Sequence, residues 1–345
     1  MTASCFDYNG FDEETLLSLC SPSRVSRGIV PWKYWPSEIY SFGRHYRSYG
    51  RYPSFLPIYC YSSHGVYDTK AYPHEVENDS YAMLCVSPAI IDAYKENCDK
   101  PCYCVPSPFV WYRKKNRIEK SSSAKGTLAF ATHSTPDVDA VMDYEAYADM
   151  LLSLPKDFFP ITVCLHMHDI DKGLHKIFLQ KDIPVYTAGH AEDVRFAQRW
   201  YEIVRHFSYT TSNMFGSHVF YSVEMGIPFF LMGDRSTWVN HGNKNIPLGE
   251  LHMDKDHLPA EALFTERVDQ VTPEQRAFVE KHLGIHDGLS RKEFSKLLYT
   301  AWFRKANIAK DLYELVKYQA KNMARPAYHR AKNAWAAFRS RVNNQ

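Results

Sequence analysis

The chain has 345 residues, of which 45% are hydrophobic and 23% are charged, and its net charge is +2. This composition is typical of a globular protein with room for two domains, and it excludes a disordered chain. No apolar run is long enough to span a bilayer, and residues 1–11 lack the basic and apolar regions of a signal peptide. We therefore expect a cytoplasmic protein. The cysteines fit this expectation, since they show neither a disulfide framework nor a zinc-binding spacing.

In the first part of the chain, short apolar runs alternate with helical segments. The runs predict strands at Leu56–Tyr61, Tyr81–Val86 and Cys102–Val105, with helices at Glu13–Cys20 and Ala89–Asn97. The aromatic and basic stretch 31–53 contains too many Pro and Gly residues for one regular element. Strands that alternate with helices predict parallel βα units, so we assign residues 1–115 to an N-terminal Rossmann-like domain that would bind an acceptor.

A polar stretch from Arg113 to Lys125 has the composition of a linker, and we place the boundary at 116–125. Beyond it, strands are predicted at Thr127–Ala131, Ile161–Leu165, Pro184–Tyr186, Phe207–Thr210 and Pro228–Met232. The helices predicted between them are Asp139–Leu154, Lys172–Gln180, Ala191–His206 and Gly216–Met225. This order predicts a doubly wound parallel sheet over 126–305, with further helices at Pro273–His282 and Arg291–Ala306. The fold class is α/β with two Rossmann-like domains and a helical, basic tail at 306–345.

Polar side chains follow four successive strands of the second domain. Ligands of an open parallel sheet bind beyond the carboxyl ends of its strands, so these loops should form one site. The candidate residues are His133, Ser134, His166, His168, His190, Thr211, Ser212, Asn213, Gly216, Ser217 and His218. In the last loop, Ser, Asn and Gly precede a helix, an arrangement that holds phosphate at the positive end of the helix dipole. An ordinary helix N-cap explains the same residues and stays open.

The segment TSNMFGSHVFYSVEMGIPFFLMG (211–233) resembles the nucleotide-sugar half of GT-B glycosyltransferases and their epimerase relatives. The resemblance extends more loosely over 126–233, and His166 falls where sialyl- and Kdo-type transferases keep a nucleotide-contacting His-Pro motif. By this resemblance Ser212, Asn213, Gly216 and Ser217 would contact the donor phosphate, and Glu224 would contact the ribose. It implies a CMP- or UDP-sugar donor and a glycan or lipid-linked glycan acceptor, as in bacterial surface-polysaccharide synthesis, with no cofactor.

An inverting transferase needs a base for the attacking hydroxyl. His64, directly after a predicted strand, is the first candidate and Asp68 the second. A retaining enzyme needs no such base, and the sequence leaves both open. The Asp-x-Asp triplets at Asp137 and Asp169 fall at predicted helix starts, where Asp caps a helix, so we expect no metal.

Several alternatives remain at this stage. They are a nucleotide-sugar epimerase, a glycerophosphotransferase, which the His64-Gly65 pair also resembles, and a non-catalytic nucleotide- or glycan-binding protein. The sequence has neither a Gly-x-Ser-x-Gly elbow nor a P-loop. No nucleic-acid-binding module accompanies the basic tail, so nucleic acid is not an expected partner.

The tail is basic and amphipathic. From Lys317 onward it has seven Lys or Arg residues and no acidic residue, and Pro326 predicts a break. One interpretation is a terminal helix that crosses back over the first domain. The other is an interfacial helix past Pro326, with Trp335 and Phe338 inserted into an anionic membrane, which would place the enzyme on the inner face of the plasma membrane.

Overall fold

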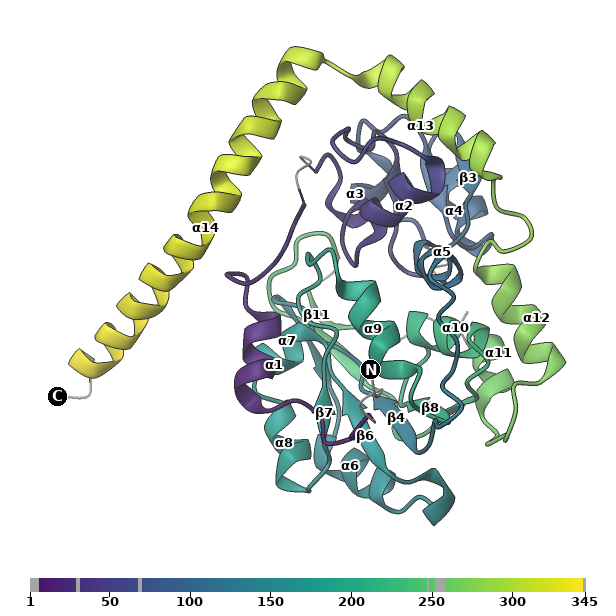
Figure 1. Cartoon of the computed structure of the whole chain (residues 1–345), viewed down its shortest axis with the longest axis vertical. Coiled ribbons are helices and arrows are strands. Elements are labelled where there is room, and N and C mark those ends of the chain that lie inside the picture. The colour runs from purple at the N-terminus through teal and green to yellow at the C-terminus, as the bar shows by residue number, and fades with distance from the viewer. Residues whose placement is uncertain (1–5, 29–31, 68–69, 247, 252–257, 344–345) are drawn as a thin grey trace, which may run out of the picture.

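The computed structural model describes residues 6–28, 32–67, 70–246, 248–251 and 258–343 (Figure 1). Two parallel sheets with their helices form the upper and lower parts of the molecule in Figure 1. A long C-terminal helix leaves the upper part and runs down one side. The predicted α/β class with two Rossmann-like parts and a helical C-terminal region is confirmed.

The larger sheet has five parallel strands in the order β7-β6-β4-β8-β9. They are β4 (Thr127–Phe130), β6 (Ile161–Cys164), β7 (Val185–Tyr186), β8 (Tyr209–Ser212) and β9 (Phe229–Leu231). The central strand β4 pairs with two neighbours, so that Thr127 lies opposite both Ile161 and Tyr209. Strands buried on both faces need continuous apolar runs, which is why the sequence predicted all five to within two residues.

Helices cover both faces of this sheet because alternate strand residues point to opposite sides. Leu128 and Phe130 pack with α9 and α10, whereas Ala129 packs with α6 and α7. These helices and their neighbour are α6 (Tyr144–Leu152), α7 (Met167–Asp171), α8 (His175–Gln180), α9 (Phe196–Val204) and α10 (Ser217–Glu224). The helix predicted at 172–180 begins only at His175, since Gly173 interrupts it with φ of +80°.

The smaller sheet has three parallel strands, β1 (Tyr61–Ser62), β2 (Met83–Cys85) and β3 (Cys102–Cys104), in that order. Around it lie α2 (Phe42–Gly50), α3 (Pro73–Val76), α4 (Ala89–Asn97) and α5 (Pro108–Lys115), with a short turn η1 (Trp35–Ser37). The stretch 31–53 thus contains a regular helix, α2, that the sequence did not predict. Packing decides this, since Phe42 and Tyr46 on α2 are buried in the main core.

A third, antiparallel sheet was missed. It joins β5 (Val138–Val141) to β10 (Thr237–Asn240) and β10 to β11 (Gly249–Leu251). The predicted helix at 139–154 is therefore wrong at its start, because α6 begins at Tyr144 with Asp143 as its N-cap. The register pairs Asp139 with Val239, a partner one hundred residues away that local periodicity does not reveal. The first Asp-x-Asp triplet, at Asp137, therefore runs into β5 and caps no helix, whereas the second, at Asp169, lies within α7, whose N-cap is His166.

Contacts cross the predicted domain boundaries in both directions. The segment before α1 (Glu13–Cys20) lies along the larger sheet, where the Phe11 amide donates to the Val185 carbonyl at 2.8 Å. Conversely, the C-terminal helices α12 (Pro273–His282) and α13 (Arg291–Lys305) return toward the smaller sheet. Between them, the Leu289 amide donates to the Cys104 carbonyl at 2.9 Å. The remaining short elements are η2 (Lys156–Phe158), α11 (Leu258–Glu261) and η4 (Ala262–Phe264).

The last helix, α14, spans Ile308–Asn343 without interruption. The expected break at Pro326 is absent, because the helix continues through it. Its first turns are anchored by Asp311, whose carboxylate accepts from Lys33 at 2.6 Å and from the Tyr59 hydroxyl at 2.5 Å. Over the ranges that the structure describes, no helix is both long and apolar enough to cross a bilayer.

Candidate functional site

The parallel register brings the predicted loops to one edge of the larger sheet. Phe130, at the end of β4, lies opposite Cys164 on β6 and Ser212 on β8, and Cys164 lies opposite Tyr186 on β7. The loops after these four strands therefore begin side by side. This is the arrangement that the sequence predicted from the polar residues after each strand.

Three histidines from two of these loops form a cluster. The ring centres of His133 and His166 are 4.5 Å apart, and those of His166 and His168 are 5.1 Å apart. Burial and the neighbouring imidazoles lower the pKa of His166 well below its ordinary value. Burial, His133 and Lys172 lower the pKa of His168 to about 4. At neutral pH these two imidazoles are thus uncharged, and each offers one donor and one acceptor nitrogen.

His64 reaches this cluster from the other sheet. It follows β1, and its ring centre lies 5.4 Å from that of Tyr40. The Tyr40 hydroxyl is 3.2 Å from Nε2 of His166, so Tyr40 connects the two histidines. The structure therefore places His64 beside the loops that carry the predicted donor site. The second candidate base, Asp68, lies outside the described residues.

Tyr40 is a site residue that the sequence did not indicate. Its backbone adopts φ of +53°, an uncommon conformation for a bulky residue, and its amide donates to the Ala191 carbonyl at 2.7 Å. Such backbone geometry persists only where the surroundings enforce it, and it is frequent at functional sites. No local signal distinguishes Tyr40 from the other tyrosines of the chain, because its role depends on loops more than a hundred residues away.

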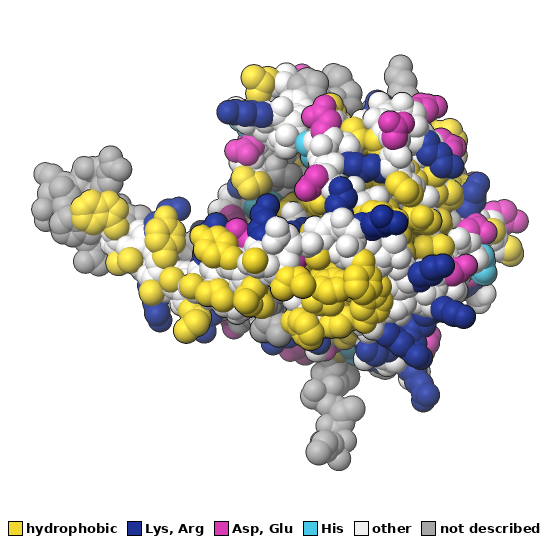
Figure 2. All heavy atoms as spheres, turned by 90° about the horizontal axis from the view of Figure 1, so that it is seen from above, with side chains coloured by type: hydrophobic (Ala, Val, Ile, Leu, Met, Phe, Trp, Pro, Cys, Tyr) yellow, Lys and Arg dark blue, Asp and Glu magenta, His cyan; other side chains and the backbone are white. Residues whose placement is uncertain are grey.

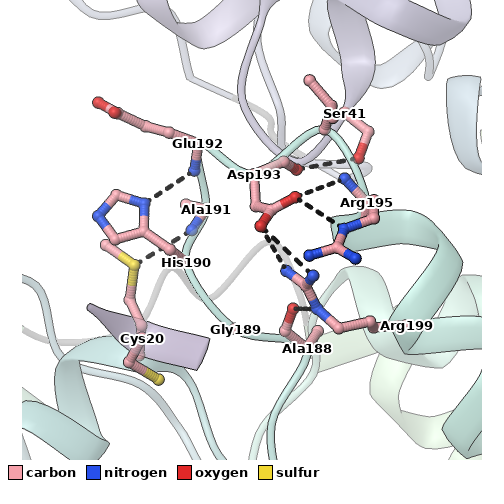
Figure 3. Close-up of polar contacts among 12 residues, drawn as sticks. Cys20, Ser41, Ala188, Gly189, His190, Ala191, Glu192, Asp193, Arg195 and Arg199 are labelled. Atoms are coloured by element: carbon pink, nitrogen blue, oxygen red, sulfur yellow. Dashed lines mark hydrogen bonds and ion pairs between the residues drawn. The ribbon is translucent and has the colours of Figure 1, made fainter. Parts of the chain in front are cut away.

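The loop between β7 and α9 holds His190 (Figure 3). The His190 amide donates to the Leu19 carbonyl at 3.0 Å, and its Nδ1 accepts from the Glu192 amide at 3.1 Å. Burial lowers the pKa of His190 to about 4. Gly189 is required here, since its φ is +84° and a Cβ atom would lie 2.9 Å from the Leu19 carbonyl oxygen.

Asp193 braces the same loop on the side away from His190 (Figure 3). Its carboxylate pairs with Arg199 of α9 at 3.3 Å and accepts from the Arg195 amide at 2.8 Å. The Ser41 hydroxyl donates to the Asp193 carbonyl at 3.3 Å, which ties the loop to the start of α2. These contacts make the loop a rigid support for His190.

In the β8–α10 turn, several predicted phosphate ligands are bonded within the protein. The side-chain oxygen Oδ1 of Asn213 accepts from both the backbone amide and the hydroxyl of Thr132 at 3.0 Å. Its Nδ2 donates to the Ser236 hydroxyl at 2.8 Å. The Thr211 hydroxyl donates to a carbonyl of β9, and Ser212 accepts from a nearby amide. All three side chains are buried. They join strand ends, and their contact with phosphate stays a prediction.

Ser134 is also engaged internally. It is 1% exposed, its amide donates to the carboxylate of Asp169 at 2.9 Å, and its hydroxyl accepts from the Ala140 amide at 3.1 Å. Asp169 is itself fully buried, and burial raises its pKa. This pair fixes the loop after β4 to the loop after β6, on which His166 and His168 stand.

The start of α10 remains more open. Gly216 is its N-cap and has no side chain that could cap the first turn. The Ser217 hydroxyl accepts from the Val66 amide at 3.3 Å, which joins the turn to the loop after His64. Burial and His133 lower the pKa of His218 to about 3, and its ring stacks on Phe130 at 4.7 Å. Uncapped amides at a helix N-terminus favour an anion.

Glu224 has a different environment from the one expected. Both its carboxylate oxygens accept from Arg113 of α5 at 2.7 Å, and the two side chains are only 4% and 9% exposed. A bidentate, buried pair of this kind leaves little capacity for a ribose. The geometry gives Glu224 a structural partner, and the ribose contact inferred from the resemblance has no geometric support.

Over the described ranges, no group of three or more His, Cys, Asp or Glu side chains could hold a metal ion. Two cavities, of about 270 and 530 Å³, lie away from the histidine cluster. The first is lined by residues 22–28 and α14, including Arg27 and Arg325, and the second by α6.

No protein-family model matches this sequence, and no curated protein matches it. Among solved structures, a similar one is the UDP-GlcNAc 2-epimerase from Neisseria meningitidis bound to UDP-GlcNAc. The sequence identity is 10% and the TM-score is 0.34. The match covers 66% of this chain and 62% of the epimerase chain.

Proposed function

We propose that the chain is an enzyme that binds a nucleotide-sugar at the edge of the larger sheet and transfers the sugar to a growing cell-surface glycan. The observation that carries this proposal is the meeting of two sets of loops. Loops after β4, β6, β7 and β8 converge with the loop after β1, which bears His64. A donor and an acceptor held by different sheets would meet there.

The start of α10 is suited to the donor phosphate. The helix begins at Gly216 and Ser217, whose backbone amides lie at the positive end of the helix dipole, where an anion is favoured. The neutral imidazole of His218 stands in the first turn of α10 and can donate a hydrogen bond to a phosphate oxygen.

His64 is suited to the acceptor. In an inverting reaction its imidazole would accept the proton of the attacking hydroxyl while the bond between the sugar and the nucleotide phosphate breaks and the new glycosidic bond forms. Tyr40 would orient His64 relative to His166 through its ring and its hydroxyl. The donor is a CMP- or UDP-sugar by the resemblance of residues 211–233, and no metal or cofactor takes part.

A nucleotide screen tests the donor site. A ligand that binds only the folded state raises its stability by RT ln(1 + [L]/Kd), about 2.7 kcal/mol at a hundredfold excess over Kd. We expect CMP, CDP or UDP to raise the melting temperature, and GDP to act as a control. Absence of any shift with all four nucleotides would overturn the proposal.

The alternative reaction on the same site is epimerisation of a nucleotide-sugar, which requires no acceptor. Incubation of the protein with UDP-GlcNAc alone, followed by chromatography of the sugar, separates the two. A new epimer formed without acceptor would favour the epimerase, and a product formed only with added glycan would favour the transferase. CDP-glycerol in the same assay tests the glycerophosphotransferase. Binding without turnover of any donor would leave the non-catalytic protein.

A further inference from the structure

The helix α14 presents an apolar side to solvent. Ile308, Leu312, Val316 and Met323 are spaced so that they fall on one side of the helix, and they are 71%, 60%, 61% and 82% exposed. Phe303, at the end of α13, is 75% exposed. Figure 2 shows a band of hydrophobic side chains along the projecting helix that continues onto the body of the molecule. A helix in water normally turns this side toward the protein core.

A different side of α14 makes the contacts with the body. Asp311 pairs with Lys33, the ring of Tyr318 lies 6.2 Å from that of Trp32, and Arg325 pairs with Glu192 at 3.1 Å. These partners are polar or aromatic and come from separate parts of the chain. The helix is thus held in a fixed orientation by its polar side, and this orientation directs the apolar side outward.

Basic residues form a second exposed stripe next to the apolar one. The stripe consists of Lys310, Lys317, Lys321 and Lys332, all exposed, while the exposed Arg330 falls on the same side of the helix as Leu312. Two acidic residues lie in the first two turns, Asp311 and Glu314, and none follows them in the sequence. Asp311 is engaged by Lys33 and Tyr59. The exposed surface of α14 therefore combines an apolar stripe with an almost uniformly positive one.

The combination of an apolar and a basic stripe indicates what kind of surface α14 binds. Two copies of the chain that buried the apolar stripe against each other would bring two rows of positive charge together, which is unfavourable. An anionic lipid surface instead accepts apolar side chains below its headgroups and attracts the lysines and arginines beside them. We propose that α14, together with Phe303, lies on the surface of an anionic membrane. The whole exposed length from Ile308 takes part, rather than only the segment past Pro326.

This inference does not depend on the nucleotide-sugar site, because none of the predicted donor residues lies on α14. It would place the enzyme at a surface where a lipid-linked glycan acceptor is available. The charge contributes about a fivefold gain in binding constant for each basic residue near such a surface. The apolar side chains add the burial of hydrocarbon area.

Co-sedimentation with phosphatidylcholine–phosphatidylglycerol vesicles tests the proposal on the full chain. The wild type should bind at low salt, bind more weakly at high salt, and bind pure phosphatidylcholine poorly. The triple variant Leu312→Glu/Val316→Glu/Met323→Glu should bind at least about tenfold more weakly. The matched control is Leu152→Glu/Leu179→Glu on α6 and α8, at exposed positions of the other domain, which should bind as the wild type does.

Three outcomes would overturn the inference. The first is a wild type that ignores the anionic vesicles, and the second is a triple variant that binds them as well as the wild type. The third is a wild-type dimer in analytical ultracentrifugation that the triple variant converts to a monomer, which would make this side a contact between copies. The nucleotide-induced melting shift should be equal in the wild type and the variant. A missing shift in both would instead count against the donor site and leave the membrane result standing.

Discussion

The β8–α10 turn and the histidine-bearing loops after β4 and β6 border the same edge of the larger sheet, but their polar side chains have different partners. In the turn, Asn213 bonds to Thr132 and Ser236 within the protein. In the loops, the imidazoles of His133, His166 and His168 pack against one another, and His133 also bonds to the Ser134 carbonyl while His166 bonds to Tyr40. Short side chains such as Asn and Ser reach only the neighbouring strand ends, whereas an imidazole extends past them.

This difference shows which residues a ligand can engage. A buried amide with all its hydrogen bonds made has no capacity left for a phosphate, and removal of such a residue acts on the fold. The imidazoles of His166 and His168 are partly exposed, so a ligand can reach them at little cost to the fold. We therefore expect variants in the two regions to differ in what they change: stability for the first, binding or turnover for the second.

Removal of His64 should have the largest effect on the histidine side. If the reaction inverts, His64→Ala should lower kcat by roughly 100- to 10,000-fold, the usual contribution of general acid–base catalysis, with donor affinity unchanged. Steady-state kinetics with the identified donor and acceptor measure it. The control is His74→Ala, another exposed histidine of the same domain. Turnover close to that of the wild type in His64→Ala would remove this residue from the mechanism, and would favour a retaining reaction or Asp68.

The Arg113–Glu224 pair tests the structural interpretation of α10. Arg113→Ala and Glu224→Ala should each lower the free energy of unfolding by about 3–5 kcal/mol, because each leaves a buried charge without its partner. The double variant should lose less than the sum of the two. Urea unfolding measures this. A Glu224→Ala protein that keeps its stability but loses nucleotide affinity would restore the ribose contact predicted from the resemblance.

Ser217 and Asn213 lie in the same turn, but we expect their removal to change different properties. Ser217→Ala should weaken nucleotide binding by about 1–3 kcal/mol, as for the loss of a hydrogen bond to a charged group. Asn213→Ala should instead act mainly on stability, because its amide joins β4, β8 and the segment after β9. Ser222→Ala on the same helix is the matched control, since its buried hydroxyl has no partner in the described chain. Equal affinity of Ser217→Ala and wild type in calorimetry would remove the phosphate role.

The smallest expected effect is the pH dependence of folding stability that arises from His190. His190 has its pKa lowered to about 4 in the folded protein, so in acid the unfolded chain binds more protons than the folded one. Stability should therefore be complete above about pH 6.5 and decline as the pH falls toward 4, by about 1 kcal/mol for this residue between pH 6.5 and 5.5. His190→Asn, which keeps an acceptor for the Glu192 amide, should flatten this dependence, whereas His286→Asn should not. An unchanged slope in His190→Asn would contradict the assignment.

Local patterns predicted most of the larger sheet. The apolar runs of β4, β6 and β9 identified strands because both faces of each strand are buried. The helices α1, α4 and α12 have the predicted bounds, supported at α1 and α12 by an Asp12 and a Thr272 cap. The residues after each strand were predicted to form one site because parallel strands end at one edge, and the site stays a prediction. That inference needed only the order of elements.

The amino-acid sequence by itself determined the α/β class, the polar loops that follow the strands, and the basic tail. Each of these depends on residues that are close together in the chain. Tertiary structure alone decided that Val138–Val141 forms a strand with β10, and that Tyr40 joins His64 to His166. It also decided that Glu224 pairs with Arg113 and that α14 turns its apolar side outward. The physical reason is that hydrogen-bond partners and burial are set by segments a hundred or more residues apart, and no local periodicity records which of them will meet.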